Sequence, residues 1–199
     1  MSSNHVVQLF DTDLSRAQNI AAFVADGLAA GERCIVVVRP ETASAVEEQL
    51  QTLGVAVPDA IAGGRLIVQD AHETLRSISR NGTPDRALFT QVMEPAVRAL
   101  AGPQGLRGCG EMVDILAQRG DLKGSIALEA MWCELMEQVP MVLLCAYSSV
   151  HFVSTATHPA LIDICQVHSH IHRDVQDPLG NWLLTAAHNR GGAGSTLQH

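Results

Sequence analysis

Short runs of apolar residues alternate along this chain with longer segments in which apolar residues recur at every third or fourth position. The short runs have the length of buried strands and lie at 5–10, 34–38, 66–68, 106–109 and 141–146. Helical spacing is clearest over 14–28, 46–53 and 89–100. Strands that alternate with helices are typical of a parallel sheet covered by helices on both faces. The pattern predicts an α/β three-layer sandwich around a mostly parallel sheet of about five or more strands.

Local signals predict where some elements begin and where the domain ends. We expect a helix to begin at Thr83-Pro84-Asp85. Threonine is a favoured N-cap residue, and proline and an acidic residue are favoured in the first turn that follows it. Residues 190–199 are rich in glycine and are expected to form a flexible tail. No repeat or linker interrupts residues 1–189, which predicts a single domain.

Charge and hydropathy exclude two classes of partner. The formal net charge is −8, and only 13 of the 199 residues are lysine or arginine. Because nonspecific nucleic-acid binding depends on basic groups that displace phosphate counterions, no nucleic-acid partner is expected. The N-terminal residues lack a signal-peptide pattern, and no apolar run is long enough to span a bilayer. We therefore expect a cytoplasmic protein without a membrane partner.

The cysteines are expected to be inert. There are five of them, an odd number without a C-x-x-C motif, which favours a reducing compartment. Cys34 and Cys145 lie in apolar strand segments, and Cys109 also has apolar neighbours, so buried thiols are predicted. No G-x-S-x-G segment is present, and nucleophilic catalysis is not predicted.

The alternation of strands and helices suits a nucleotide-binding domain, but the residues that hold phosphates are missing. The only lysine is Lys123, and no segment matches the G-x-x-x-x-G-K-[ST] phosphate loop. Asp11 and Asp13 follow the first strand, where two acids would repel a phosphate, and N-capping of the next helix suits them better. The sequence predicts a degenerate nucleotide-binding scaffold that does not hydrolyse ATP.

Residues after the predicted strands form a candidate ligand pocket, because ligands of open α/β sheets bind outside the carboxyl ends of the strands. The groups there are Phe10-Asp11, Arg39-Pro40, Asp70-Ala71-His72, Gly110-Glu111 and Tyr147-Ser148. Arg39 offers a fork of donors and Tyr147 combines a ring with a hydroxyl, which suits a small molecule with a polar head. The alternative interpretation is that these residues are polar only because they lie in loops.

Cys165, His168 and His172 are candidate metal ligands at spacings of three and four. If residues 159–175 form a helix, all three lie on one stripe, where thiolate and imidazole can bind zinc or another transition metal. No second Cys or His motif accompanies them. The sequence favours a polar helix face without a metal, with His168 beside a ligand.

Six short motifs occur in the order found in one known family. They are His5 to Phe10 followed by Asp11 and Asp13, Gly27-Leu28-x-x-Gly31-Glu32, Gly110-Glu111-Met112, Leu128-Glu129 before Trp132, Leu144-Cys145-Ala146-Tyr147, and Ile164-Cys165 followed by His168. Through these motifs the segment from Asn4 to His172 resembles the MEDS domain, the methanogen and methylotroph DcmR sensory domain.

The resemblance implies a RecA-like core without working phosphate-loop catalysis, and a role in sensing small organic compounds in bacterial signal transduction. It also implies a signalling partner such as a histidine kinase or a transcription regulator. A homo-oligomer is compatible with the sequence, and no cofactor is identified. We expect a non-enzymatic sensory or regulatory domain whose ligand contacts Phe10, Asp11, Arg39, Glu111, Tyr147 and His168. The alternatives are a metal-dependent or nucleotide-dependent enzyme and a protein-interaction module without a ligand.

Two glutamates each have a structural and a chemical interpretation. Glu111 opens the helix after the fourth strand, where a carboxylate stabilises the helix dipole. This structural role explains the residue on its own, and the resemblance, which places it near an acidic residue of RecA-like ATPases, adds a ligand-facing role as the alternative. Glu129 lies among apolar residues at helical spacing, where a carboxylate is costly unless it is paired. We expect it to form a salt bridge with an arginine such as Arg107.

Overall fold

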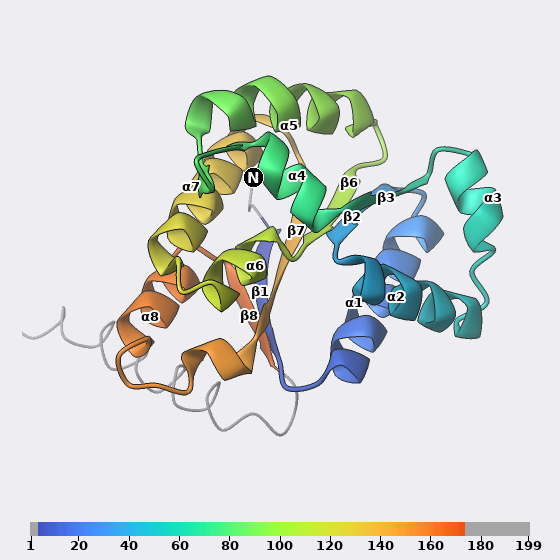
Figure 1. Cartoon of the computed structure of the whole chain (residues 1–199). Coiled ribbons are helices and arrows are strands. Elements are labelled where there is room, and N and C mark those ends of the chain that lie inside the picture. Colours follow the sequence, from blue (N-terminus) through green and yellow to red (C-terminus); the bar gives the residue numbers. More distant parts are fainter. Residues whose placement is uncertain (1–3, 174–199) are drawn as a thin grey trace, which may run out of the picture.

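A computed structural model describes residues 4–173 and has three layers, with a parallel sheet between two layers of helices (Figure 1). The six strands of this sheet lie in the order β3, β2, β6, β7, β1, β8. Their bounds are Asn4–Phe10 (β1), Arg33–Val38 (β2), Leu66–Asp70 (β3), Leu106–Gly110 (β6), Val142–Ser148 (β7) and His170–Arg173 (β8). The predicted α/β sandwich is confirmed, and each of the five predicted strands is present. The tail predicted at 190–199 lies outside the described residues.

Each face of the sheet has its own apolar core, because successive side chains of a strand point to opposite faces. Val7 and Leu9 of β1 join the core under α4 to α8, whereas Val6 and Phe10 join the core under α1 to α3. Figure 1 shows these two groups of helices on opposite sides of the sheet. The helix bounds are Asp13–Ala29 (α1), Pro40–Thr52 (α2), Val57–Ala62 (α3), Ala71–Ser77 (α4), Arg86–Leu100 (α5), Met112–Gln118 (α6), Leu122–Gln138 (α7) and His158–Gln166 (α8).

Strand β8 occupies the second half of the segment 159–175, so the condition under which Cys165, His168 and His172 would share one helix is not met. Helix α8 ends at Gln166, and the chain then pairs with the edge of β1, with Val6 opposite His170. The backbone N–H of Ser169 donates to the carbonyl of His5 at 2.8 Å, just before the pairing begins. An added strand satisfies the unpaired backbone groups that β1 would otherwise present at the edge of the sheet. Consequently Cys165, His168 and His172 do not share a helical stripe.

The predicted helix start at Thr83 is also displaced. Thr83–Pro84 is strand β5, which pairs with β4 (Ser79–Arg80), and α5 starts two residues later with Asp85 as its N-cap. Asn81 and Gly82 between these strands have positive φ angles of 53° and 84°. Asn-Gly is the preferred pair for such a tight hairpin turn, and this local signal outweighs the helix-start signal that follows it.

Helix α1 is capped by Thr12, whose hydroxyl accepts a hydrogen bond from the N–H of Ser15 at 3.1 Å. The N-capping role expected of Asp11 and Asp13 is therefore wrong, because the cap is Thr12, the residue between them. Asp13 is the first helical residue, and Asp11 accepts a hydrogen bond from the Ser149 hydroxyl instead. Only Asp11 and Thr12 separate β1 from α1, and this short turn lies at the edge of the candidate site.

Candidate functional site

A polar cleft of about 400 Å³ opens at the carboxyl ends of β2 and β7, the edge of the sheet at which a ligand is expected. The first turns of α1 and α2, helix α6 and the short 3-10 helix η1 (Ser149–Phe152) surround it. The lining residues that carry charge or titrate are Asp13, Arg16, Arg39, Glu41, Asp114 and His151.

Glu111 lies directly beneath this cleft and organises its floor. The carboxylate is fully buried and accepts hydrogen bonds from the Arg39 N–H at 2.8 Å, from Arg16 Nη1 at 2.8 Å and from the Thr42 hydroxyl at 3.2 Å. Arg39 Nη1 also lies 3.2 Å from the same carboxylate. Glu111 thus joins α1, the end of β2 and the start of α6. Glu111 is the N-cap residue of α6, as the helix-dipole interpretation requires, but its side chain makes no hydrogen bond to the N–H groups of that helix. Its contacts are instead with α1, α2 and the end of β2.

Asp114, in α6, forms part of the wall of the cleft. Its carboxylate accepts hydrogen bonds from Arg39 Nη2 and from the backbone N–H of Ser148, both at 2.7 Å, and it lies 3.2 Å from His151 Nε2. Burial by itself would raise the pKa of Asp114, but the bonds from His151 and Ser148 and the charge of Arg39 bring that pKa below its usual value. Asp114 therefore stays ionised and ties the end of β7 to α6.

Asp114→Asn is expected to reduce the dependence of the free energy of unfolding on pH in the acid range. The unfolded carboxylate takes up a proton near pH 4, whereas the folded one has a lower pKa and stays ionised. The stability that Asp114 contributes is therefore complete above pH 4 and is lost as the pH falls through the folded pKa. Urea unfolding between pH 3 and 6 should show that the difference in free energy of unfolding between wild type and Asp114→Asn becomes smaller toward pH 3. A difference that stays constant or grows toward pH 3 would contradict the lowered pKa of Asp114.

The charges in and beneath the cleft are unequal. Four carboxylates, those of Asp13, Glu41, Glu111 and Asp114, face two guanidinium groups. Arg16 pairs with Glu111 and with Asp13, and Arg39 pairs with Glu111 and Asp114. Both arginines are therefore paired with carboxylates, and the carboxylates and guanidinium groups in and beneath the cleft sum to a negative charge.

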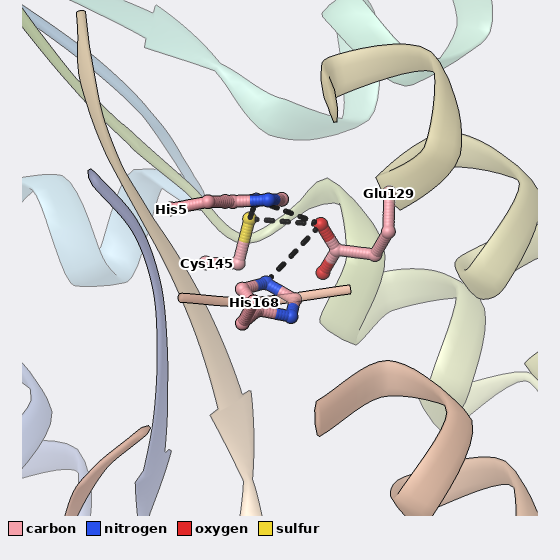
Figure 2. Close-up of side chains that lie close together, drawn as sticks. All are labelled: His5, Glu129, Cys145 and His168. Carbon is pink, nitrogen blue, oxygen red and sulfur yellow. Dashed lines mark hydrogen bonds and ion pairs between the residues drawn. The ribbon is translucent and has the colours of Figure 1, made fainter. Parts of the chain in front are cut away.

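A second group of titratable side chains lies inside the protein, between the sheet and α7 (Figure 2). It comprises His5 of β1, Glu129 of α7, Cys145 of β7 and His168, which follows α8. One ligand-type atom from each of the four lies within 4.8 Å of the others. All four residues are buried, which sets them apart from the open cleft.

Glu129 is the centre of this inner cluster. Its Oε2 lies 3.1 Å from the Cys145 sulfur, 3.2 Å from His5 Nε2 and 3.5 Å from His168 Nε2. Its Oε1 accepts a hydrogen bond from the Tyr147 hydroxyl at 2.7 Å. Burial alone would raise the pKa of Glu129, but His168 first and His5 second hold that pKa far below its usual value. The cluster therefore contains a buried carboxylate anion.

The salt bridge expected between Glu129 and Arg107 is wrong, because the two side chains lie on opposite faces of the sheet. Arg107 Nε pairs with Glu32, Nη1 donates to the carbonyl of Phe23, and the guanidinium lies over the Phe23 ring at 5.1 Å. Glu129 instead faces the core that contains Cys145 and Tyr147. The prediction that Glu129 needs a partner holds, but the partners are the two histidines.

The five cysteines are free, and none has the lowered pKa of a nucleophile. Burial raises the pKa to about 11 for Cys34 and Cys133 and to about 12 for Cys165, and to well above the usual value for Cys109 and Cys145. The thiols are thus protonated at neutral pH, in agreement with the inert thiols predicted from the sequence.

The six predicted ligand residues separate into three groups. Arg39 lines the cleft and Glu111 lies beneath it, while Asp11 is exposed beside Ser149. Phe10 and Tyr147 are fully buried on opposite faces of the sheet. His168 belongs to the inner cluster. Tyr147 does not reach the cleft because β7 continues to Ser148, and the tyrosine side chain points into the core beside Glu129.

Comparison with known proteins gives one clear match. A family described as MEDS, the methanogen/methylotroph DcmR sensory domain, matches residues 4–169. No curated protein matches the chain. Among the residues that the structure describes, no helix combines the length and the apolar character needed to cross a bilayer.

Proposed function

Because the chain belongs to the MEDS family of sensory domains, we propose that it senses a small polar organic molecule and performs no chemistry on it. The observation that carries the proposal is the cleft of about 400 Å³, which lies over the buried ion pairs of Glu111. Such a floor is fixed before a ligand arrives and offers oriented polar groups, as small-molecule sites generally do. We place Arg39, Asp114 and His151 in contact with the ligand.

The excess of carboxylates supports a ligand without negative charge. A phosphate or carboxylate would approach Asp13 and Glu41 at the rim, and both arginines are already paired. A neutral alcohol or an ammonium group would instead find unopposed acceptor oxygens. The ligand class we propose is therefore a small alcohol, amino alcohol or amine.

The turn between β1 and α1 supports a scaffold that has lost nucleotide hydrolysis. A phosphate loop occupies this place in RecA-like proteins, but here Asp11 and Thr12 alone connect the two elements. Lys123 is the second residue of α7 and is not part of this turn. No lysine is therefore available at the turn to neutralise a phosphate.

Transmission of a signal would use the segments that surround the cleft. A ligand that binds one arrangement of α1, α2 and η1 more tightly than another shifts the population toward it. The hydrogen bond from Ser148 to Asp114 joins the end of β7 to the cleft, so closure would also move η1. The receiving molecule would be a signalling protein such as a histidine kinase or a transcription regulator.

The test is a thermal-shift titration of the full chain with ethanolamine, glycerol, acetate, phosphate and ATP, combined with native mass spectrometry of freshly purified protein. We expect ethanolamine or glycerol to raise the melting temperature, and the three anions to have no effect. Phosphate release from ATP should stay at background. Hydrolysis of ATP, or stabilisation by the anions alone, would refute the proposal.

A matched pair of variants locates the binding site. Glu41→Gln removes one charge at the rim of the cleft and should weaken the ethanolamine shift. Asp59→Asn removes one charge from exposed α3, outside the cleft, and should leave the shift unchanged. Equal effects of the two substitutions would show that the response depends on overall charge and not on this site.

A further inference from the structure

We propose that His5, Glu129, Cys145 and His168 form a buried site for a divalent transition-metal ion, with zinc as the best match to these donors. The site is separate from the cleft and does not depend on the proposed ligand. It uses other residues than the helical stripe considered from the sequence, and shares only His168 with it. Four chain segments contribute one ligand each: β1, α7, β7 and the connection between α8 and β8 (Figure 2).

The first argument is the spacing of the donor atoms. Zinc bonds of about 2.0 to 2.3 Å in a tetrahedron place neighbouring ligand atoms about 3.3 to 3.7 Å apart. Glu129 Oε2 lies 3.1 to 3.5 Å from the other three donor atoms. His5 Nε2 and the Cys145 sulfur are 3.3 Å apart. The two remaining separations, from His168 Nε2 to His5 and to Cys145, are at most 4.8 Å. Three of the atoms are thus already spaced for one ion, and a movement of His168 toward them would complete the site.

The second argument is the orientation of His168. Its Nδ1 lies 2.6 Å from the carbonyl oxygen of Ile164, which can only accept, so Nδ1 carries the proton. In the neutral ring this leaves a lone pair on Nε2, which is buried and has no hydrogen-bond partner. This atom lies 3.5 Å from Oε2 of Glu129, at the outer limit of a hydrogen bond. A cation bound between the two atoms would give each of them a close contact, and a carbonyl on the other ring nitrogen is the usual support of a metal-binding histidine.

The third argument is the balance of charge inside the core. Glu129 and Cys145 are completely or almost completely buried, and a charge is costly there unless it is compensated. When a divalent ion binds, Cys145 loses its thiol proton to solvent and the imidazoles bind as neutral ligands. One thiolate and one carboxylate then balance the two positive charges of the ion. A thiolate, two imidazoles and a carboxylate suit zinc, and four protein donors close the shell as in structural sites.

Surrounding groups hold two more of the ligands in place. The Tyr147 hydroxyl, itself 3.0 Å from Ser125 Oγ, donates to the second oxygen of Glu129 and leaves Oε2 for the metal. The Cys133 sulfur lies 3.3 Å from Nδ1 of His5, on the side of the ring away from the cluster. Such outer contacts orient metal ligands.

The test is metal analysis of the full chain purified without chelators, followed by titration of the metal-stripped protein with Co²⁺. We expect about one zinc per chain, and about one equivalent of Co²⁺ with the thiolate-to-cobalt absorption that requires a cysteine ligand. The cobalt spectrum is measured on wild-type protein, so it decides the question even where a variant fails to fold. A wild-type chain that binds neither ion overturns the proposal.

Two serine substitutions assign the thiolate. Cys145→Ser should remove the cobalt absorption and lower metal affinity at least tenfold, whereas Cys109→Ser should keep both. Cys109 is a matched control, because both cysteines are 2% exposed and their side chains lie in opposite cores. Cys165→Ser should also keep both. Absorption that persists in Cys145→Ser, or that is lost in folded Cys165→Ser, would overturn this ligand set.

Discussion

Glu111→Ala is expected to lower the free energy of unfolding by about 3 to 5 kcal/mol, the usual cost of removing one partner from a buried ion pair. The carboxylate is fully buried and binds Arg16, the Arg39 backbone and Thr42. Its loss leaves Arg16 without its buried partner, and Arg39 keeps its ion pair with Asp114 and its hydrogen bond to Gln118. Urea unfolding followed by circular dichroism measures the effect.

The control for this prediction is Glu41→Ala. Glu41 lies on the same cleft but is exposed, and its removal should change stability by less than about 0.5 kcal/mol. A small effect of Glu111→Ala, similar to that of Glu41→Ala, would mean that the ion pairs under the cleft do not hold the fold together. The proposed ligand site would then lack a fixed floor.

Most of the sheet could be predicted from the sequence because its inner strands β2, β6, β7 and β1 are buried on both faces and therefore form continuous apolar runs. β8 lacks this signal, because three of its four residues, HIHR, are polar, and it forms because the edge of β1 is available to it. The hairpin before α5 was predictable in principle, since Asn81-Gly82 is a recognised turn pair. Elements defined by their own residues, such as the apolar strands and this hairpin, can thus be found from sequence, whereas β8, which depends on a distant partner, cannot.

The cleft was predicted in position but only partly in composition. A cleft lies at the carboxyl edge of the sheet, where a pocket was expected, and Arg39 and Glu111 meet there; its role as a ligand site stays a prediction. Arg16, Asp114 and His151 were missed, because they lie within helices or turns and reach the cleft only after the chain folds.

The inner cluster was missed as a site, although one signal for it was present. Glu129 in an apolar helix indicated a buried partner, but sequence spacing could not identify a partner 124 residues away in His5. The alternation of side chains along a strand puts Cys145 and Tyr147 on one face, and that face is turned toward α7. A search for polar residues on the faces of predicted buried strands would have selected both.

The cleft and the inner cluster are connected through the end of β7. Tyr147 donates to Glu129 in the cluster, and the next residue, Ser148, donates to Asp114 in the wall of the cleft. Two consecutive residues thus contact two different sites, Tyr147 through its side-chain hydroxyl and Ser148 through its backbone N–H. A change at one site has a direct covalent route to the other, which suits a domain that must respond as a unit.

Tyr147→Ala is expected to lower the free energy of unfolding by about 3 to 5 kcal/mol, as truncation of a buried aromatic residue typically does. The side chain is fully buried, its ring packs edge-on against Phe152 with centroids 5.7 Å apart, and its hydroxyl binds Glu129. Tyr147→Phe keeps the ring and removes only the hydroxyl, which leaves a buried carboxylate with one donor fewer. This change should cost about 1 to 3 kcal/mol. Chemical unfolding of both variants separates packing from hydrogen bonding. If Tyr147→Ala were as stable as wild type and only weakened ligand binding, the tyrosine would belong to the cleft, as the sequence predicted, and not to the support of Glu129.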